Sequence, residues 1–144
     1  MPAPCATALL DQIHAATRDA RTLLGALAQQ RRERVEETLP PLWLLAQRQA
    51  FVTALMTGQG RFCPHLGASP QPAFTAAWAP GALTCAACFP SLKPDPVEDR
   101  TCDHCRTEHP TLHNCLAAFG PILMAYGLCP ACMTLLHPAP DDRQ

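Results

Sequence analysis

Apolar residues in the first third of the chain recur at helical spacing and predict one long helix over residues 5–38. They step by 4, 3, 4, 3 and 4 positions and so stay on one helix face; they are Leu9, Ile13, Ala16, Ala20, Leu23 and Leu27. No proline interrupts this stretch. We expect the seam to pack on the next helix or to bind another protein or a second copy. The residues expected to bind the partner are Leu9, Ile13, Leu23 and Leu27.

A second helix is expected over residues 41–57, because Thr38 is a suitable N-cap and proline is tolerated in a first helical turn. It is apolar over much of its surface, with Leu42, Trp43, Leu44, Leu45, Phe51, Val52, Leu55 and Met56. Such a helix is normally buried, so we expect it to lie between the first helix and the cysteine-rich region, in a helical hairpin over residues 5–60. At about 1.5 Å per residue, the first helix reaches roughly 50 Å and the second roughly 25 Å. The first helix should therefore overhang its partner.

From residue 61 onward, short apolar stretches alternate with turn signals. Residues 112–119 and 122–128 flank a Gly-Pro pair and predict a β-hairpin, although the run around Cys115 also fits a helix. Residues 133–137 predict a short helix that ends before Pro138. The polar, proline-containing stretch 93–100 predicts a linker between two units.

Nine cysteines in 144 residues would suit a disulfide-rich secreted protein, but the start of the chain lacks the basic and apolar regions of a signal peptide. No run of about 18 apolar residues is present that could span a membrane. We therefore expect a soluble, cytoplasmic protein whose C-x2-C pairs bind metal and form no disulfides. A net charge of −1, from 11 basic and 12 acidic residues, gives no electrostatic reason for tight nucleic-acid binding.

The cysteines fall into two clusters with the spacing of metal ligands. Two C-x2-C pairs separated by 23 residues provide the ligand set of a closed tetrahedral zinc site, namely Cys102, Cys105, Cys129 and Cys132. Upstream, a C-x-H motif and a C-x2-C motif provide a second set, namely Cys63, His65, Cys85 and Cys88. We expect two structural Zn²⁺ ions, whose binding contributes on the order of 10 kcal/mol to folding.

The eight ligands can be paired in two ways. Sequential pairing keeps each zinc within one cluster and leaves the 93–100 linker free to bend, and it is the arrangement we favour. In cross-braced pairing, the first and third pairs share one zinc and the second and fourth share the other. Cross-bracing would resemble RING-type domains and would make the two clusters inseparable.

The order of a cysteine knuckle, a hairpin and a C-x2-C motif at the start of a helix is that of a treble-clef zinc finger. Residues 102–137 resemble this fold group, and residues 63–92 resemble it more loosely, with C-x-H in place of the first C-x2-C. The resemblance implies a small zinc-stabilised α+β fold with a helical hairpin over 5–60 and fingers over 61–92 and 101–137. A helical hairpin before a four-cysteine finger is also similar to the layout of the DksA/TraR group, which acts on RNA polymerase. The tip expected here lacks that group's acidic residues.

An enzymatic role is not expected, because a catalytic zinc keeps one coordination position open and both expected sites are closed by protein ligands. The H-x-E motif of zinc-dependent deaminases is absent from the chain. We expect a regulatory zinc-binding module that presents its first helix and apolar finger surfaces to a protein partner. One alternative is a nucleic-acid or transcription-complex factor with Arg31, Arg32 and Arg34 as first contacts. Another is a thiol redox sensor that releases zinc on oxidation.

The remaining notable side chains have structural interpretations. Cys115 lies in an apolar run and is expected to be a core thiol. Trp43 and Trp78 are also expected in the core. His104 lies between two zinc-ligand cysteines and is expected to point away from the metal.

Overall fold

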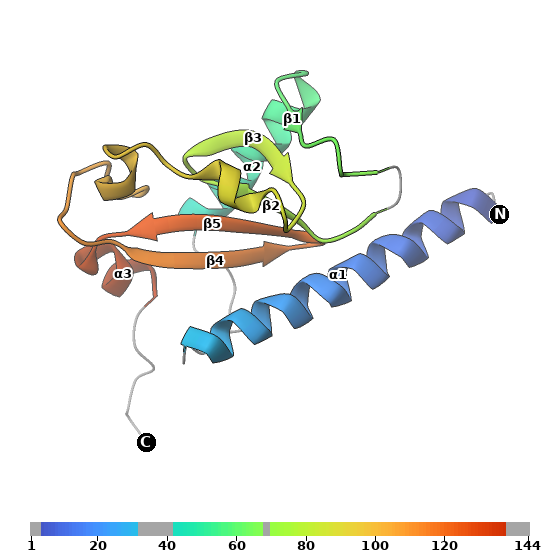
Figure 1. The fold of residues 1–144 in the computed structure, drawn as a ribbon, viewed down its shortest axis with the longest axis horizontal. Coiled ribbons are helices and arrows are strands. Elements are labelled where there is room, and N and C mark those ends of the chain that lie inside the picture. Colours follow the sequence, from blue (N-terminus) through green and yellow to red (C-terminus); the bar gives the residue numbers. More distant parts are fainter. Residues whose placement is uncertain (1–3, 32–41, 68–69, 138–144) are drawn as a thin grey trace.

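The computed structural model describes residues 4–31, 42–67 and 70–137. They form a small α+β fold with a long N-terminal helix and a mixed sheet (Figure 1). The helices are α1 (Pro4–Arg31), α2 (Leu42–Met56) and α3 (Pro130–Leu136), the strands are β1 (Arg61–Phe62), β2 (Ala73–Ala76), β3 (Ala79–Thr84), β4 (His113–Phe119) and β5 (Ile122–Leu128), and the 3-10 turns are η1 (Phe89–Leu92) and η2 (Glu98–Arg100). Among the described residues, we find no helix with the length and apolar character needed to cross a bilayer.

The five strands form one sheet in the order β1-β3-β2-β5-β4. β2 and β3 are antiparallel, as are β4 and β5, whereas β1 runs parallel to β3. The two halves of the sheet meet where β2 pairs in parallel with β5 over residues 73–76. The linker over 93–100 therefore does not separate two independently moving units, because the strands on either side of it share backbone hydrogen bonds.

The predicted hairpin of 112–119 and 122–128 is confirmed as β4 and β5, which pair from His113 beside Leu128 to Phe119 beside Ile122. Gly120 sits in the turn with a φ of 56°, a left-handed conformation that glycine adopts without steric cost. β5 is almost entirely buried because it lies inside the sheet, which explains its continuous apolar sequence. The predicted end of the first helix at residue 38 lies outside the described residues.

α1 and α2 pack on opposite faces of the sheet. On one face, Leu123 of β5 packs with Ala20 of α1. On the other face, the ring of Tyr126 lies 5.6 Å from the ring of Trp43 in α2. Figure 1 shows α2 behind the strands, while α1 runs past the sheet toward the N-terminus. The expected packing of α2 between α1 and the cysteine-rich region is therefore wrong, because each helix covers its own face of the sheet.

Small residues from the middle to the C-terminal end of α1 allow the helix to approach the sheet closely; Ala16, Ala20 and Ala28 are buried there. Leu23 packs on the same apolar cluster, and Leu27 is half-buried. Toward the N-terminus, Ile13 is half-buried and Leu9 is 48% exposed. From Ala16 onward the predicted apolar seam is therefore covered within the described chain, whereas Leu9 at its start is not.

α2 is buried on one face only. Its inner face carries Phe51, which is 2% exposed and whose ring lies 5.8 Å from the ring of Phe119. Ala54 is buried on the same face. On the opposite face, Leu42 is 85% exposed and Met56 is 82% exposed. The expectation that this whole helix is buried is therefore only half right.

Candidate metal centres

The first cluster lies where two parallel strands end side by side. Cys63 follows β1 and Cys85 follows β3, and the Cys63 backbone N–H donates to the carbonyl of Leu83 at 3.1 Å. The Cys85 backbone N–H then donates to the Cys63 sulfur at 3.2 Å. The parallel pairing of β1 with β3 thus brings together cysteines that are 22 positions apart in sequence.

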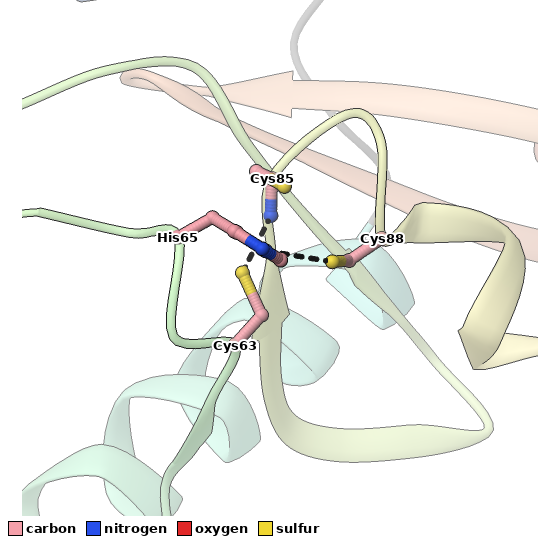
Figure 2. Close-up of side chains that lie close together, drawn as sticks. All are labelled: Cys63, His65, Cys85 and Cys88. Atoms are coloured by element: carbon pink, nitrogen blue, oxygen red, sulfur yellow. Dashed lines mark hydrogen bonds between the residues drawn. The ribbon is translucent and has the colours of Figure 1, made fainter.

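Two further side chains complete this cluster. Cys88 is held by a turn in which its backbone N–H donates to the carbonyl of Cys85 at 3.2 Å. The His65 Nδ1 lies 3.1 Å from the Cys88 sulfur, and Figure 2 shows the four side chains converging. Each of Cys63, His65, Cys85 and Cys88 offers one ligand atom, and all four atoms lie within 4.8 Å of one another. His65 is exposed and the three thiols are half-buried, so the cluster opens toward solvent.

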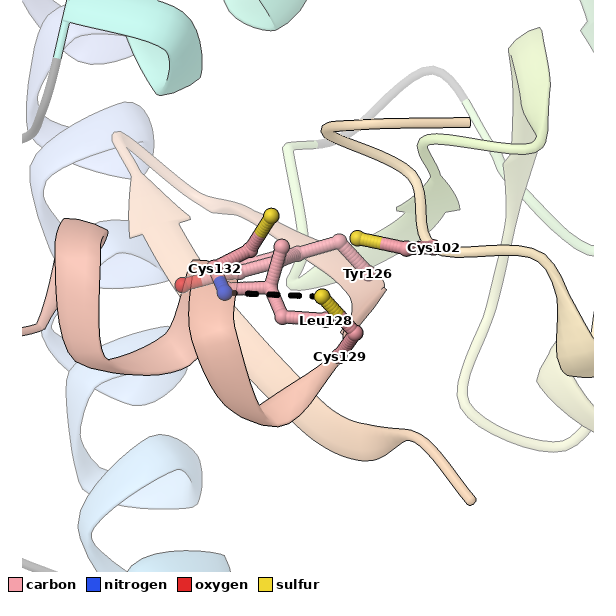
Figure 3. Close-up of a cluster of buried hydrophobic side chains, with 5 residues drawn as sticks. All are labelled: Cys102, Tyr126, Leu128, Cys129 and Cys132. Carbon is pink, nitrogen blue, oxygen red and sulfur yellow. Dashed lines mark hydrogen bonds between the residues drawn. The ribbon is translucent and has the colours of Figure 1, made fainter. Parts of the chain in front are cut away.

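The second cluster is built from a knuckle and the start of α3. Cys129 is the N-cap of α3, and its sulfur accepts a hydrogen bond from the Cys132 backbone N–H at 3.4 Å, as drawn in Figure 3. Pro130 occupies the first turn of the helix, where its missing N–H has no cost. The proline inside this C-x2-C motif therefore helps to start the helix.

The knuckle that carries Cys102 and Cys105 turns back on itself. The Arg106 backbone N–H donates to the Cys102 carbonyl at 2.9 Å, and Arg106 adopts a φ of 59°. This left-handed conformation is uncommon for residues other than glycine, aspartate and asparagine. The Arg106 side chain reaches Glu98 at 2.6 Å and Asp103 at 3.6 Å, and these ion pairs hold the strained residue in place.

The ligand atoms of Cys102, Cys105, Cys129 and Cys132 also lie within 4.8 Å of one another. The sulfurs of Cys105 and Cys129 are 3.9 Å apart. Four sulfurs around a zinc ion with bonds of about 2.3 Å would be separated by about 3.8 Å, so this spacing fits a tetrahedral zinc ion. Cys102, Cys129 and Cys132 are buried and Cys105 is exposed, so this cluster is more enclosed than the first.

The two groups that the structure forms are the sequential ones. Each C-x2-C or C-x-H pair meets its neighbour in sequence, and the cross-braced alternative does not occur among the described residues. None of the cysteines whose side chains are described takes part in a disulfide. Each cluster can therefore hold one metal ion, with four protein ligand atoms available to it.

The thiols of each cluster differ in acidity. In the first cluster, burial raises the pKa of the Cys63 thiol, but the backbone N–H groups of Cys85 and His65 lower it, so that it falls to about 6. A hydrogen bond with Cys85, together with burial, raises the pKa of Cys88 to about 11. The hydrogen bond and burial thus keep a proton on the Cys88 thiol, and a divalent cation would have to displace that proton in order to bind.

The second cluster shows the same division. Hydrogen bonds from Thr107 lower the pKa of the Cys105 thiol to about 5. Burial, followed by hydrogen bonds with the other cluster cysteines, raises the pKa of the Cys132 thiol. Zinc binding by either cluster therefore has to displace protons, because the metal ligand is the thiolate.

Three residues near the second cluster have roles that the sequence pattern did not indicate. The buried Asp103 accepts a hydrogen bond from the Gly127 backbone N–H at 2.7 Å, and burial raises the pKa of its carboxyl group. His104 does not point away from the cluster, since its Nδ1 lies 3.2 Å from the Cys132 sulfur. Trp43 holds that imidazole from α2, with ring centroids 5.6 Å apart. The position of Asp103 and His104 between two cysteines could have suggested that their side chains contact the cluster. The contact of His104 with Trp43 had no signal in the sequence.

Cys115 and Trp78, which were expected in the core, are both half-buried. Cys115 belongs to neither ligand group and is half-buried against the cluster around Tyr126 and Leu128. Trp78 is half-buried, and its indole Nε1 donates to the carbonyl of Leu92 at 2.6 Å. His137 accepts or donates a hydrogen bond at the hydroxyl of Tyr126, 2.9 Å away.

In comparisons with known proteins, no protein-family model, curated protein or solved structure matches this chain. The geometry of the two clusters and of the helices is therefore the basis for a functional proposal.

Proposed function

We propose that this chain is a non-catalytic protein-interaction module that binds two structural Zn²⁺ ions and presents the N-terminal half of α1 to a partner protein. Four protein ligands fill the coordination sphere of a tetrahedral zinc ion and leave no position for a reacting water. The closed ligand sets in both clusters support a structural role for the metal. Free thiols at metal-ligand spacing suit a reducing compartment such as the cytoplasm.

The order of elements around the second cluster supports its assignment to a treble-clef finger. A knuckle with Cys102 and Cys105 comes first, the β4–β5 hairpin follows, and Cys129 and Cys132 stand at the start of α3. Around the first cluster the β2–β3 hairpin follows the C-x-H motif, and the 3-10 turn η1 takes the place of the helix. In this proposal, the two fingers share one sheet and act as a single rigid base.

The exposure of α1 is the observation that carries the proposal. Leu9 is 48% exposed and Leu10 is 53% exposed, while Ala20, farther along the same helix, is completely buried. The helix is thus anchored at its C-terminal half and projects apolar side chains from its N-terminal half. An exposed apolar helix face beside polar neighbours suits helix-in-groove recognition by another protein.

The test compares partner capture by three forms of the zinc-loaded full chain. Immobilised wild-type protein is incubated in native extract, beside the variant Leu9→Asp/Leu10→Asp and the matched control Gln12→Glu. We expect the double variant to lose at least about tenfold of the specifically captured partner, because two apolar side chains that the proposed complex would bury become charged. The control should capture as the wild type does, since Gln12 is exposed and polar.

Zinc content and the circular dichroism spectrum are measured for each form, because only an intact fold makes the comparison valid. Equal capture by the wild type and the double variant would contradict a binding role for the N-terminal half of α1. If the captured material contains nucleic acid, and its capture falls as the salt concentration rises, the transcription-factor alternative is favoured.

A further inference from the structure

The outer face of α2 carries an apolar stripe, interrupted at its centre by Gln49, with no partner in the described chain. The stripe consists of Leu42, Leu45, Gln49, Val52 and Met56, and we call it the α2 stripe. Its four apolar members are 85%, 40%, 39% and 82% exposed, in chain order. Their spacing of three and four residues places them on one helix face, opposite the face that buries Phe51 and Ala54. Exposed apolar surface of this extent marks a binding surface.

From this stripe we infer that two copies of the chain associate through antiparallel pairing of their α2 helices. The stripe is nearly symmetric about Gln49, with apolar residues seven and four positions before it and three and seven positions after it. An antiparallel pair centred on Gln49 would place Leu42 of one copy against Met56 of the other. Apolar side chains then meet along the length of the contact.

Gln49 suits the centre of such a pair. An amide side chain has both donors and an acceptor, so two glutamines related by a two-fold axis can satisfy each other. A lone polar residue within an apolar helix seam also fixes the register and orientation of the pair, at some cost in stability. Gln49 is exposed in the single chain, and its side-chain amide donates a long hydrogen bond of 3.4 Å to the Thr53 hydroxyl in the same helix.

The charge distribution favours a second copy over a charged partner. Arg48 is the only charged residue of α2, and its guanidinium lies 5.8 Å from the centre of the Phe119 ring, on the flank of the helix. The stripe itself contains no charge, so two copies can approach without like-charge repulsion. A partner that recognised the stripe through ion pairs would find nothing to pair with.

The size of the surface predicts a weak dimer. A helix of 15 residues is about 22 Å long, and two such stripes would bury roughly 1,000 Å² in total, at the low end of specific interfaces. We therefore expect a dissociation constant on the order of tens of micromolar. The stripe lies on the other side of the sheet from α1, so this inference does not depend on the proposed partner of α1.

Sedimentation equilibrium of the zinc-loaded full chain, from about 5 to about 500 µM, tests the inference. The wild type should show a monomer–dimer equilibrium. The variant Leu42→Glu/Met56→Glu should raise the dissociation constant of the dimer at least about thirtyfold through like-charge repulsion. The matched control Ala50→Glu changes an exposed residue of α2 outside the stripe and should leave the constant unchanged. Both stripe positions are so exposed that folding and zinc content should be unaffected.

A charge swap tests the orientation. In an antiparallel pair, Leu42→Lys/Met56→Glu brings each lysine opposite a glutamate and should dimerise better than Leu42→Lys/Met56→Lys by about tenfold or more. Equal weakness of the two variants would overturn the antiparallel arrangement. A wild type that stays monomeric at the highest concentration, or a dimer that survives Leu42→Glu/Met56→Glu but is lost in Leu9→Asp, would overturn the inference as a whole.

Discussion

Asp103 and Gly127 hold the knuckle of the second cluster against β5 through two reciprocal hydrogen bonds. The Asp103 backbone N–H donates to the Gly127 carbonyl at 2.9 Å, and the Gly127 backbone N–H donates to the Asp103 carboxylate at 2.7 Å. The Asp103 side chain is only 4% exposed. This pair aligns Cys102 with Cys129, which lies two residues after Gly127, and it therefore sets the distance between the two halves of the ligand set.

Replacing Asp103 by alanine should destabilise the zinc-loaded protein by about 1–3 kcal/mol, because the buried Gly127 N–H loses its acceptor. Asp103→Asn keeps an acceptor oxygen for the Gly127 N–H, so this variant should lose clearly less stability than Asp103→Ala. Asp99→Ala, at an exposed position close by, serves as the control and should change stability by less than about 0.5 kcal/mol. Urea denaturation followed by circular dichroism measures all three. Equal stability of Asp103→Ala and the wild type would contradict the positioning role of Asp103.

Removing one ligand of the second cluster should remove one metal ion. Cys129→Ser is expected to lower the zinc content from about two equivalents to about one and to unfold α3, because zinc binding and folding are coupled. Cys115→Ser provides the matched control, since Cys115 belongs to neither ligand group. It should retain both ions. Elemental analysis of the purified variants decides, and an unchanged zinc content in Cys129→Ser would reject the ligand assignment.

Zinc affinity should fall as the pH is lowered. At neutral pH the Cys105 thiol, with its pKa lowered to about 5, is already ionised, whereas the Cys132 thiol, with its pKa raised, keeps its proton. In the first cluster Cys88, with its pKa raised to about 11, keeps its proton as well. Zinc must displace each of these protons, so affinity should drop about tenfold per pH unit for every such thiol.

Competition with a chelator at pH 8, pH 7 and pH 6 measures this dependence. A constant affinity over that range would show that the thiols are already ionised in the metal-free protein. That result would contradict the raised pKa values of Cys88 and Cys132.

Two glycines should respond in opposite ways to alanine. Gly81 has a φ of 83°, and a Cβ there would meet the Cβ of Ala54 at 3.0 Å. Gly81→Ala should therefore destabilise the protein by at least about 1 kcal/mol, through backbone strain and through the displacement of α2. Gly25 lies within α1 with nothing within 4 Å of its Cβ position, so Gly25→Ala should stabilise by about 0.5–1 kcal/mol. Thermal unfolding of both variants tests the pair, and stabilisation by Gly81→Ala would contradict the close contact with α2.

Local patterns in the sequence were sufficient to predict the β4–β5 hairpin and which Cys and His side chains gather into the two clusters. Metal ligands at C-x2-C spacing are brought together by short turns, and the Gly120 turn allows the flanking strands to pair as neighbours. The pairing of β2 with β5 was not predictable in this way. It joins residues about fifty positions apart, and the pattern of apolar and polar residues in either strand does not indicate which strand it pairs with.

The placement of the helices was missed for a related reason. The apolar character of α2 predicted burial but did not say that the sheet would separate it from α1. The sequence pattern predicts that Leu42 and Met56 are buried, yet both side chains are exposed and face away from the sheet. His104 was missed because its contact with Cys132 spans 28 positions and depends on α3 being folded.

X-ray absorption at the zinc edge of the purified, metal-loaded protein reports the ligands of both proposed metal sites at once. We expect about two zinc ions per chain, each four-coordinate, with about seven sulfur ligands to one nitrogen ligand over the two sites and bond lengths near 2.3 Å and 2.0 Å. A single zinc ion per chain, or an oxygen ligand from water in either site, would contradict it.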